Sequence, residues 1–407
     1  MREAADQRVS FWSIALASAA LMAITTGVRL SLGLFLRPLA ASGFSIASVS
    51  LVLAVGQFCW GAVQPLFGLL ASRIGAWPVI VLGALLLTLG LALAPLCHSA
   101  AGLLLTLGVL SACGAGAGSF AILIGAAAQR LPAARRGLAA GVINAGGSCG
   151  QMVFAPLSQA LISTWGWAVA LWTLAAAGLA TLLLGRMAVG RARAASAGTR
   201  EPSSAGHALH AALQNRSYLC LHAGFFTCGL HIAFLVTHLP SEIALCGLPV
   251  ASAGAAIGLI GLCNIGGSLA VGGLGGRFRL KTLLTALYLV RALAILLYLG
   301  APKTLATLYA FSAVLGLTWL ATVPPTAGLV AKLFGVRHLA TLFGLALLSH
   351  QTGAFFGAWL GGLVLSRTGS YQWMWYLDAG LALLAAALNL PIREAAVQAV
   401  VTESANT

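Results

Sequence analysis

Long apolar stretches recur along the 407-residue chain, and they constrain its fold more than any other feature of the sequence. Each is about 20 residues long or longer, which is what an α-helix needs to cross a hydrocarbon core of about 30 Å. The chain is 60% hydrophobic and 7% charged, whereas a soluble domain carries roughly a quarter charged residues. Such a chain cannot cover itself with a water-compatible surface. The sequence therefore predicts an all-α membrane protein.

Polar breaks divide this apolar sequence into twelve candidate transmembrane helices. They lie near residues 11–36, 46–70, 78–97, 102–128, 138–162, 168–186, 218–240, 251–274, 282–300, 304–331, 340–365 and 372–391. The longest break, residues 186–217, is rich in Arg, Ser and Gly and is typical of a flexible linker. We therefore expect an N-terminal six-helix bundle over 1–186 and a cytoplasmic linker over 187–217. A C-terminal six-helix bundle with a short cytoplasmic tail should occupy 218–407.

The basic residues are divided unequally between the two sides of this arrangement. With the N-terminus in the cytoplasm, the cytoplasmic side receives Arg2, Arg8, Arg73, Arg130, Arg135, Arg136, Arg186, Arg191, Arg193, Arg200, Arg216, Arg277, Arg279, Lys281, Lys332, Arg337 and Arg393. The opposite side receives Arg37, Lys303 and Arg367, and Arg29 and Arg291 fall within helices. Cytoplasmic loops collect Lys and Arg, so we expect both termini to be cytoplasmic.

The net charge of +15 does not indicate a nucleic-acid partner. A nucleic-acid-binding protein presents a continuous basic face interleaved with aromatic residues, and no segment of this chain offers one. Arginine outnumbers lysine and alanine is abundant. This composition is typical of a GC-rich bacterial genome, and so we expect a bacterial inner membrane.

The two halves of the chain contain a repeat. When residues 135–141 are aligned with 337–344 so that Gly141 matches Gly344, Gly150 falls on Gly353. The offset is 203 residues, about half of the chain. Many transporters build a site between two repeated halves, so the repeat favours a two-bundle transporter.

On these residues the chain resembles the major facilitator superfamily over essentially its whole length. Residues 135–141 (RRGLAAG), with Gly146, Gly147 and Gly150, resemble the start of the fifth helix in monocarboxylate-transporter-like members. Residues 27–35 (GVRLSLGLF) are similar to the first helix of bacterial relatives of that group. The resemblance implies twelve transmembrane helices in two pseudo-symmetric bundles, a transporter rather than an enzyme, and a monomer.

Two departures from the family pattern matter. The loop after the second helix carries Gly68, Arg73 and Gly75, but Ser72 stands where the family has an acid, and the second copy has Gly276 before Arg277. We expect these residues to form the conformational loops, without the usual acid. Monocarboxylate transporters also carry an Arg in the eighth helix. Here that helix has none near Ser268.

Three charged residues within predicted helices are candidates for function, because such residues are rare in membranes and usually functional. Arg29, in the outer third of the first helix, is our leading candidate for recognising an anionic solute; the alternative is that its side chain reaches the nearby interface. Arg291 and Asp378 lie in the ninth and twelfth helices. We favour a structural charge pair for them, with substrate binding as the alternative.

Neutral polar residues from several helices complete the predicted substrate site. They are Asn144, Gln151, His231, Asn264, Trp319, His350 and Gln351. Each can instead form a hydrogen bond between helices. Their convergence is what favours a binding site.

The overall prediction is a secondary transporter of a small, monocarboxylate-like organic anion, coupled to protons, with small molecules and lipid as its partners. Histidines supply groups that titrate near working pH, and no ATP-binding motif is present. No cofactor is expected, and the eight cysteines lack the spacing of a metal site. Two alternatives remain: an exporter of drugs or metabolites, and a transporter-like sensor.

Overall fold

A computed structural model describes residues 11–190, 209–335 and 338–395. All regular elements in these residues are helices, and the prediction of an all-α chain is confirmed. The N-terminal half contains α1 (Phe11–Ser31), α2 (Leu36–Ala41), α3 (Ile46–Ile74), α4 (Ala76–Leu93), α5 (Ala100–Leu103), α6 (Ala112–Ala117), α7 (Phe120–Arg130) and α8 (Ala133–Val189). The C-terminal half contains α10 (Arg216–Leu245), α11 (Ala251–Leu274), α12 (Leu280–Gly300), α13 (Leu305–Thr318), α14 (Val323–Phe334), α15 (Leu339–Thr368) and α16 (Gln372–Asn389).

The number of spans agrees with the expected twelve. In the described residues, nine helices are long and apolar enough to cross a membrane, when helices that follow directly on one another are joined. One of the nine, α8, is two spans: its backbone leaves helical angles only at Gly166, where φ is 83°. Separate helices were expected over 138–162 and 168–186, and the chain leaves helical geometry between them at Gly166, so α8 consists of two helices joined at this kink. The 30-residue α15 and the 18-residue α16 complete the set.

Three spans are interrupted. A 3₁₀ turn at Leu32–Phe35 separates α1 from α2, and a π-helix at Leu104–Ser111 separates α5 from α6. Between α13 and α14 the chain forms a 3₁₀ turn at Leu320–Thr322, just before the paired Pro324 and Pro325. Proline lacks the backbone donor that a helix needs, which explains this last break. Pro156, by contrast, keeps helical backbone angles within α8.

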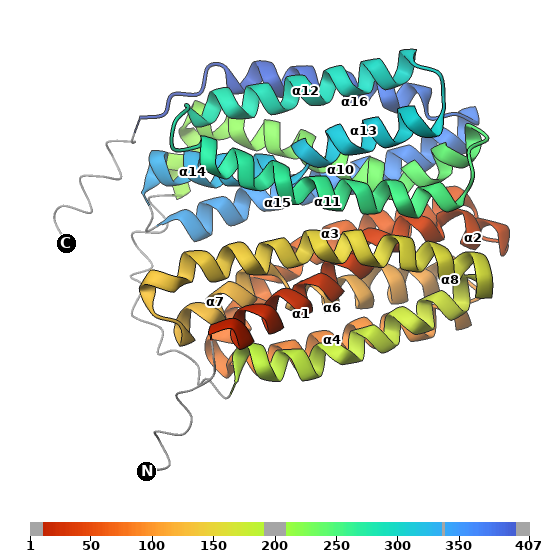
Figure 1. Cartoon of the computed structure of the whole chain (residues 1–407), viewed down its shortest axis with the longest axis horizontal. Helices are drawn as coiled ribbons and strands as arrows, with labels where there is room; N and C mark the ends of the chain where they lie inside the picture. Colours follow the sequence, from red (N-terminus) through yellow and green to blue (C-terminus); the bar gives the residue numbers. More distant parts are fainter. Residues whose placement is uncertain (1–10, 191–208, 336–337, 396–407) are drawn as a thin grey trace, which may run out of the picture.

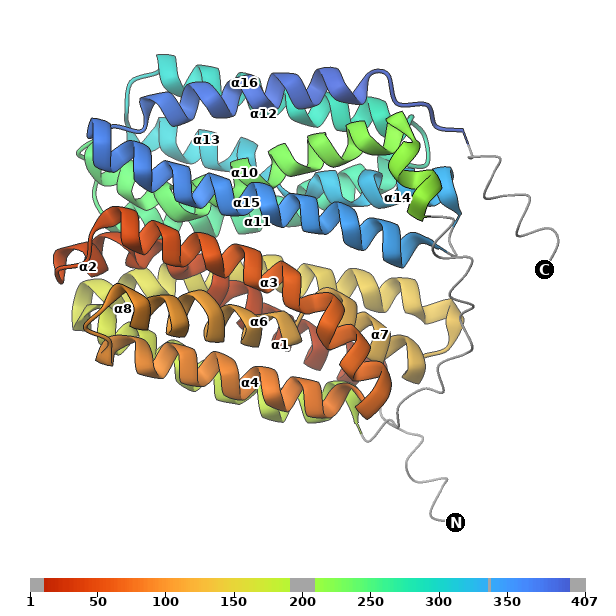
Figure 2. The same ribbon diagram turned by 180° about the vertical axis from the view of Figure 1, so that it is seen from behind.

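The two halves lie side by side, with α1–α8 below α10–α16 in Figure 1 and the same division seen from behind in Figure 2. Helix contacts in the first half recur in the second half at positions 203 residues later. A Cβ atom added to Gly150 on α8 would lie 2.0 Å from the Ala23 carbonyl oxygen of α1. A Cβ added to Gly353 on α15 would lie 2.0 Å from the Phe226 carbonyl oxygen of α10. Both members of each contact differ by 203, so the repeat is structural.

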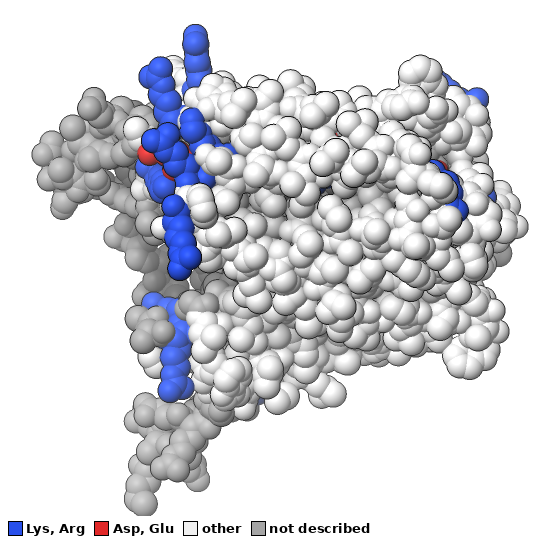
Figure 3. Space-filling model, turned by 45° about the horizontal axis from the view of Figure 1, so that its top comes forward, with Lys and Arg blue, Asp and Glu red and all other residues white. Residues whose placement is uncertain are grey.

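Charged residues gather at one end of the helices, and a broad uncharged belt separates them from the other end (Figure 3). Leucines in the belt are strongly exposed, for example Leu183 at 75% and Leu269 at 70%. An apolar surface of this kind needs lipid around it. We call the end that carries Arg130, Arg216 and Lys332 the basic end, and the opposite one the far end. Six predicted basic-side residues lie outside the described residues, namely Arg2, Arg8, Arg191, Arg193, Arg200 and Arg337, as does most of the predicted linker.

Candidate functional site

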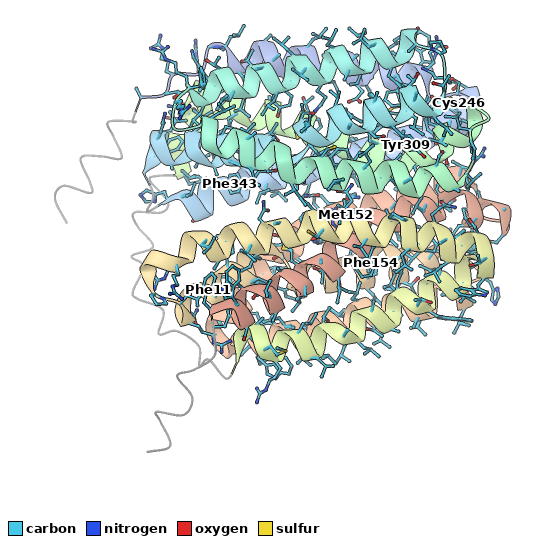
Figure 4. All side chains as sticks on the ribbon, viewed as in Figure 1. Phe11, Met152, Phe154, Cys246, Tyr309 and Phe343 are labelled. Carbon is cyan, nitrogen blue, oxygen red and sulfur yellow. The ribbon has the colours of Figure 1, made fainter. Side chains whose placement is uncertain are left out.

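The two halves touch through glycines in the part of the molecule nearer the far end. An added Cβ at Gly33 on α1's extension would lie 1.9 Å from the Val236 carbonyl oxygen of α10, and one at Gly362 on α15 would lie 2.0 Å from Ser50 Oγ on α3. A Cβ added to Gly258 on α11 would lie 3.1 Å from Pro156 Cγ and 3.2 Å from the Met152 carbonyl oxygen on α8. Figure 4 shows the labelled Met152 on α8 at this boundary with α11. The backbones are therefore in direct contact across the halves.

Toward the basic end the same helix faces lose these contacts. Residues seven apart lie on nearly the same face of an α-helix. Counting seven residues from the interface toward the basic end gives Gly68 on α3, Gly141 on α8 and Gly344 on α15. An added Cβ at any of these three glycines would meet no atom of the described residues within 4 Å. Gly272 on α11 is equally open. The halves are thus closed at the far end and parted toward the basic end.

Arg29 lies on the first helix next to the far-end contact between Gly33 and Val236, on the side of the basic end. Its Nη1 donates to Gln57 Oε1 at 2.6 Å, and its guanidinium carbon lies 4.1 Å from the centre of the Trp60 ring. Its other terminal nitrogen has no hydrogen-bond partner among the described residues and is not sealed from solvent. A cavity of about 20 Å³ beside it, which Val236 and Thr237 help to line, has room for about one water molecule. Arg29 is therefore a partly free cation held by α3.

Asn264 joins the halves near the middle of the membrane. Its Nδ2 donates to Ser148 Oγ on α8 at 2.8 Å, and its Oδ1 accepts from the Leu320 N–H in the break before α14 at 2.9 Å. Gln151, one turn beyond Ser148, is 1% exposed, and its Nε2 has no hydrogen-bond partner within the described residues. Asn144, one turn before Ser148, is half-buried where the halves begin to part. The predicted neighbours Asn144, Gln151 and Asn264 are thus brought to one interface.

The offset of 203 also relates this interface to a second one. Ser148 corresponds to Gln351 and Asn264 corresponds to Gly61, and Gln351 packs directly on Gly61, where an added Cβ would lie 2.1 Å from its Cγ. Gln351 Oε1 is buried and has no hydrogen-bond partner in the part of the chain that the structure describes. Its Nε2 lies 3.4 Å from His350 Nδ1. The predicted Gln351 therefore stands opposite α3, whereas the ring of the predicted His350 packs on Phe225 of α10, with 4.8 Å between the ring centres.

Arg291 is structural in this conformation. Its side chain is 1% exposed and donates to the Cys228 sulfur at 3.3 Å, to the Thr318 carbonyl at 2.6 Å and to the Trp319 carbonyl at 3.3 Å. Both carbonyls lie at the break between α13 and α14, and the Trp319 carbonyl also accepts from Thr322 Oγ1 at 3.5 Å. The guanidinium thus supplies the donors that the broken helix lacks.

Asp378 pairs with a residue other than the expected one. Its Oδ2 lies 2.5 Å from His231 Nδ1, and these side chains are 0% and 1% exposed. In the described residues no hydrogen bond or ion pair joins Asp378 to Arg291, so the expected pairing of these two residues is wrong. The charge of Asp378 still acts on Arg291. His231 therefore faces α16 and lies away from the cavity. Trp319 is also buried, at 1%, and is part of the C-terminal core.

The predicted conformational loops lie at the basic end. Arg73 closes α3, Gly75 ends it with φ of 91°, and Arg277 is exposed after α11. Neither arginine pairs with an acid in the described residues. An acid does act at this end: Glu394 accepts from the Lys281 N–H at 2.8 Å and from Lys332 Nζ at 2.9 Å. Partial burial acts to raise the pKa of Glu394, but these donors outweigh it and lower that pKa below its usual value.

Sequence reasoning missed several members of the site. Gln57 and Trp60 lie on α3, three residues apart and on one helix face, and this spacing was available as a signal. Cys228 and Thr322 bond to each other at 3.4 Å beside Arg291. Nothing in the sequence singles out these two small residues. In the described residues no group of three metal-binding side chains occurs.

Comparisons with known proteins agree on one family. The sequence profile of the Major Facilitator Superfamily matches residues 9–304 and 247–404. The chain is 27% identical to monocarboxylate transporter 13 of Rattus norvegicus over 387 residues, which is 92% of this chain and 86% of that protein. It is 37% identical to monocarboxylate transporter 11 of Mus musculus over 170 residues, 40% of this chain and 37% of that protein.

Two solved structures are similar throughout. A D-xylose-proton symporter superposes with a TM-score of 0.75 at 15% identity, covering 94% of this chain and 98% of its own. A bacterial homologue of the human lysosomal transporter Spinster, described as inward-facing and unoccupied, superposes with a TM-score of 0.72 at 14% identity. This second match covers 98% of this chain and 96% of that one.

Proposed function

The chain belongs to the Major Facilitator Superfamily, and from that premise we propose that it is a secondary transporter carrying a small, monocarboxylate-like organic anion by alternating access. Two six-helix units, over 1–186 and 218–407, move against each other, and the linker 187–217 joins them. The transporter is a monomer in a bacterial inner membrane. Both termini are cytoplasmic, because the basic end is then the cytoplasmic end under the positive-inside rule.

One observation carries the anion proposal: the partly free guanidinium of Arg29. A planar guanidinium matches the two oxygens of a carboxylate, and Gln57 and Trp60 hold this one in place while leaving a terminal nitrogen open. The family's arginine of the eighth helix is absent, and Asn264 in that helix is already bonded. The names of the relatives, monocarboxylate transporters 11 and 13, support the same class of substrate.

The position of Arg29 supports import. It lies directly under the contact of Gly33 with Val236, and both Val236 and Thr237 line its cavity. When this contact opens, Arg29 becomes accessible from the far side. In the present conformation the parted basic half gives a solute released from Arg29 a route to the cytoplasm. Protons are the coupling ion that we propose, in keeping with the buried histidine–carboxylate pair and the proton symporter with the similar fold.

Uptake into proteoliposomes tests the proposal. Wild-type protein should accumulate a labelled short-chain monocarboxylate when the outside is acidic, and Arg29→Gln should lower its kcat/KM by about 10- to 100-fold. This is the size expected from losing a charge-assisted hydrogen bond of about 1.5–3 kcal/mol. The matched control is Arg37→Gln, which removes an exposed arginine of the far end and should leave uptake near wild type.

Two results would count against the proposal. Unchanged uptake in a folded Arg29→Gln variant refutes the role of Arg29. Wild-type vesicles that extrude bulky cations and take up no carboxylate refute the substrate class in favour of an exporter.

A further inference from the structure

The buried pair of His231 and Asp378 holds more hydrogen-bonding capacity than it uses. The two side chains are 1% and 0% exposed and share one bond of 2.5 Å. Among the described residues, His231 Nε2 and Asp378 Oδ1 are both buried with no hydrogen-bond partner. A purely structural pair gains from saturating its polar atoms, because each buried unpaired atom is costly. Because these two atoms are unpaired, either one is available to bind a proton.

The charge around the pair is balanced when it holds no extra proton. A neutral imidazole with a carboxylate carries −1, and the Arg291 guanidinium, on which Asp378 acts electrostatically, carries +1. The other titratable groups facing this cluster from neighbouring elements are Tyr288 on α12, Cys228 on α10 and His350 on α15. Adding one proton brings the pair to zero and the cluster to +1. A buried net charge is costly unless it is compensated.

A chain of contacts connects this cluster to the proposed anion site. Arg291 bonds to Cys228, Cys228 lies beside His350, and His350 is followed by Gln351. Gln351 packs on Gly61, the neighbour of Trp60, whose ring lies under Arg29. His231 and Cys228 are three residues apart and so lie on one side of α10. This helix also carries Val236, which forms the far-end contact with Gly33.

We propose that the His231–Asp378 pair is the proton-binding site that couples transport, loaded with one proton from the far side and emptied toward the basic end. The inference rests on the proposed function, because it supplies the coupling ion of the same transporter. The proton adds +1 and the carboxylate adds −1, so the loaded protein moves both without net charge. Proton and anion thereby raise each other's affinity, and this coupling is reciprocal.

A measurement without substrate separates this inference from the proposed function. Infrared difference spectra of purified protein are recorded between acidic and neutral pH. Wild type should show a carboxyl or imidazole signal that Asp378→Asn removes and His231→Gln, as a second variant, also removes. His238→Gln is the matched control, because His238 lies on the same face of α10 with both nitrogens bonded, to Tyr371 and to Ala358. Its spectrum should keep the signal.

Transport in proteoliposomes gives the second readout. With a gradient of about one pH unit and one proton per anion, wild type should accumulate substrate up to about tenfold. Asp378→Asn should fall to about equal concentrations while keeping substrate exchange at near wild-type rates. An intact infrared signal in both folded variants, or gradient-driven accumulation by Asp378→Asn, overturns the proton site. Absence of carboxylate transport by wild type overturns the proposed function alone, since the infrared result still decides the proton site.

Discussion

Replacement of Gly33 by alanine should shift the transporter out of the conformation described above. The added Cβ would lie 1.9 Å from the Val236 carbonyl oxygen and 2.8 Å from the Thr237 Cα. Carbon and carbonyl oxygen in contact stay about 3.3 Å apart or more, and both neighbours are backbone atoms that cannot rotate away. The first helix and α10 must therefore separate by on the order of 1 Å at the far end.

The cost of this separation is conformational. Overpacking of this kind costs about 1–3 kcal/mol. The state with an open far end does not contain the contact and is spared the cost. The population ratio should then move toward that state by about 5- to 150-fold. Because α8 and α15 close at the basic end in that state, the open faces around Gly141 and Gly344 should become protected.

Amide hydrogen exchange of the otherwise native protein measures this shift. In Gly33→Ala, segments 36–50 and 241–250 should exchange faster and segments 138–147 and 340–348 more slowly. The matched control is Gly353→Ala, whose Cβ would meet the Phe226 carbonyl at 2.0 Å within the C-terminal half. It should lower the unfolding temperature without the opposed changes at the two ends. Unchanged exchange in folded Gly33→Ala, or the same opposed pattern in Gly353→Ala, would refute the reasoning.

Two further predictions concern residues that hold the C-terminal half. Arg291→Met removes the donors to the Thr318 and Trp319 carbonyls, and should destabilise the protein by about 1–3 kcal/mol for each carbonyl left unpaired; an unchanged unfolding temperature would contradict this. Glu394 has a lowered pKa, so its bonds to Lys281 and Lys332 stabilise the folded state above the ordinary glutamate value of about 4.3. This contribution should be lost as the pH falls through the lowered pKa. The stability of Glu394→Gln should therefore decline less between about pH 5 and pH 3 than that of wild type, and identical thermal profiles would argue against the role.

Polar side chains were recognisable from the sequence more easily than their partners. Asn264, Gln351 and His350 stand out because amides and imidazoles are rare in apolar stretches. The structure brings Asn264 and Gln351 to the boundary between the halves, whereas His350 packs on Phe225 within the C-terminal half. The partner of Asp378 was expected to be Arg291 because charge alone suggested it. The structure assigns His231 instead, since α10 packs against α16 and Arg291 is drawn to the carbonyls of the broken span.

The sequence by itself determined the features that lipid imposes along the chain: the all-helical class, the approximate spans, the sorting of basic residues to one end, and the repeat of 203 residues. Each depends on local composition, because a helix must be apolar for its whole length to cross the hydrocarbon core. Only the tertiary structure decided which face of each helix is buried. A helix that is apolar on every side has no amphipathic stripe to show which face is buried. The environment of Arg29, the pairing of His231 with Asp378 and the closure of the far end therefore follow from packing between helices.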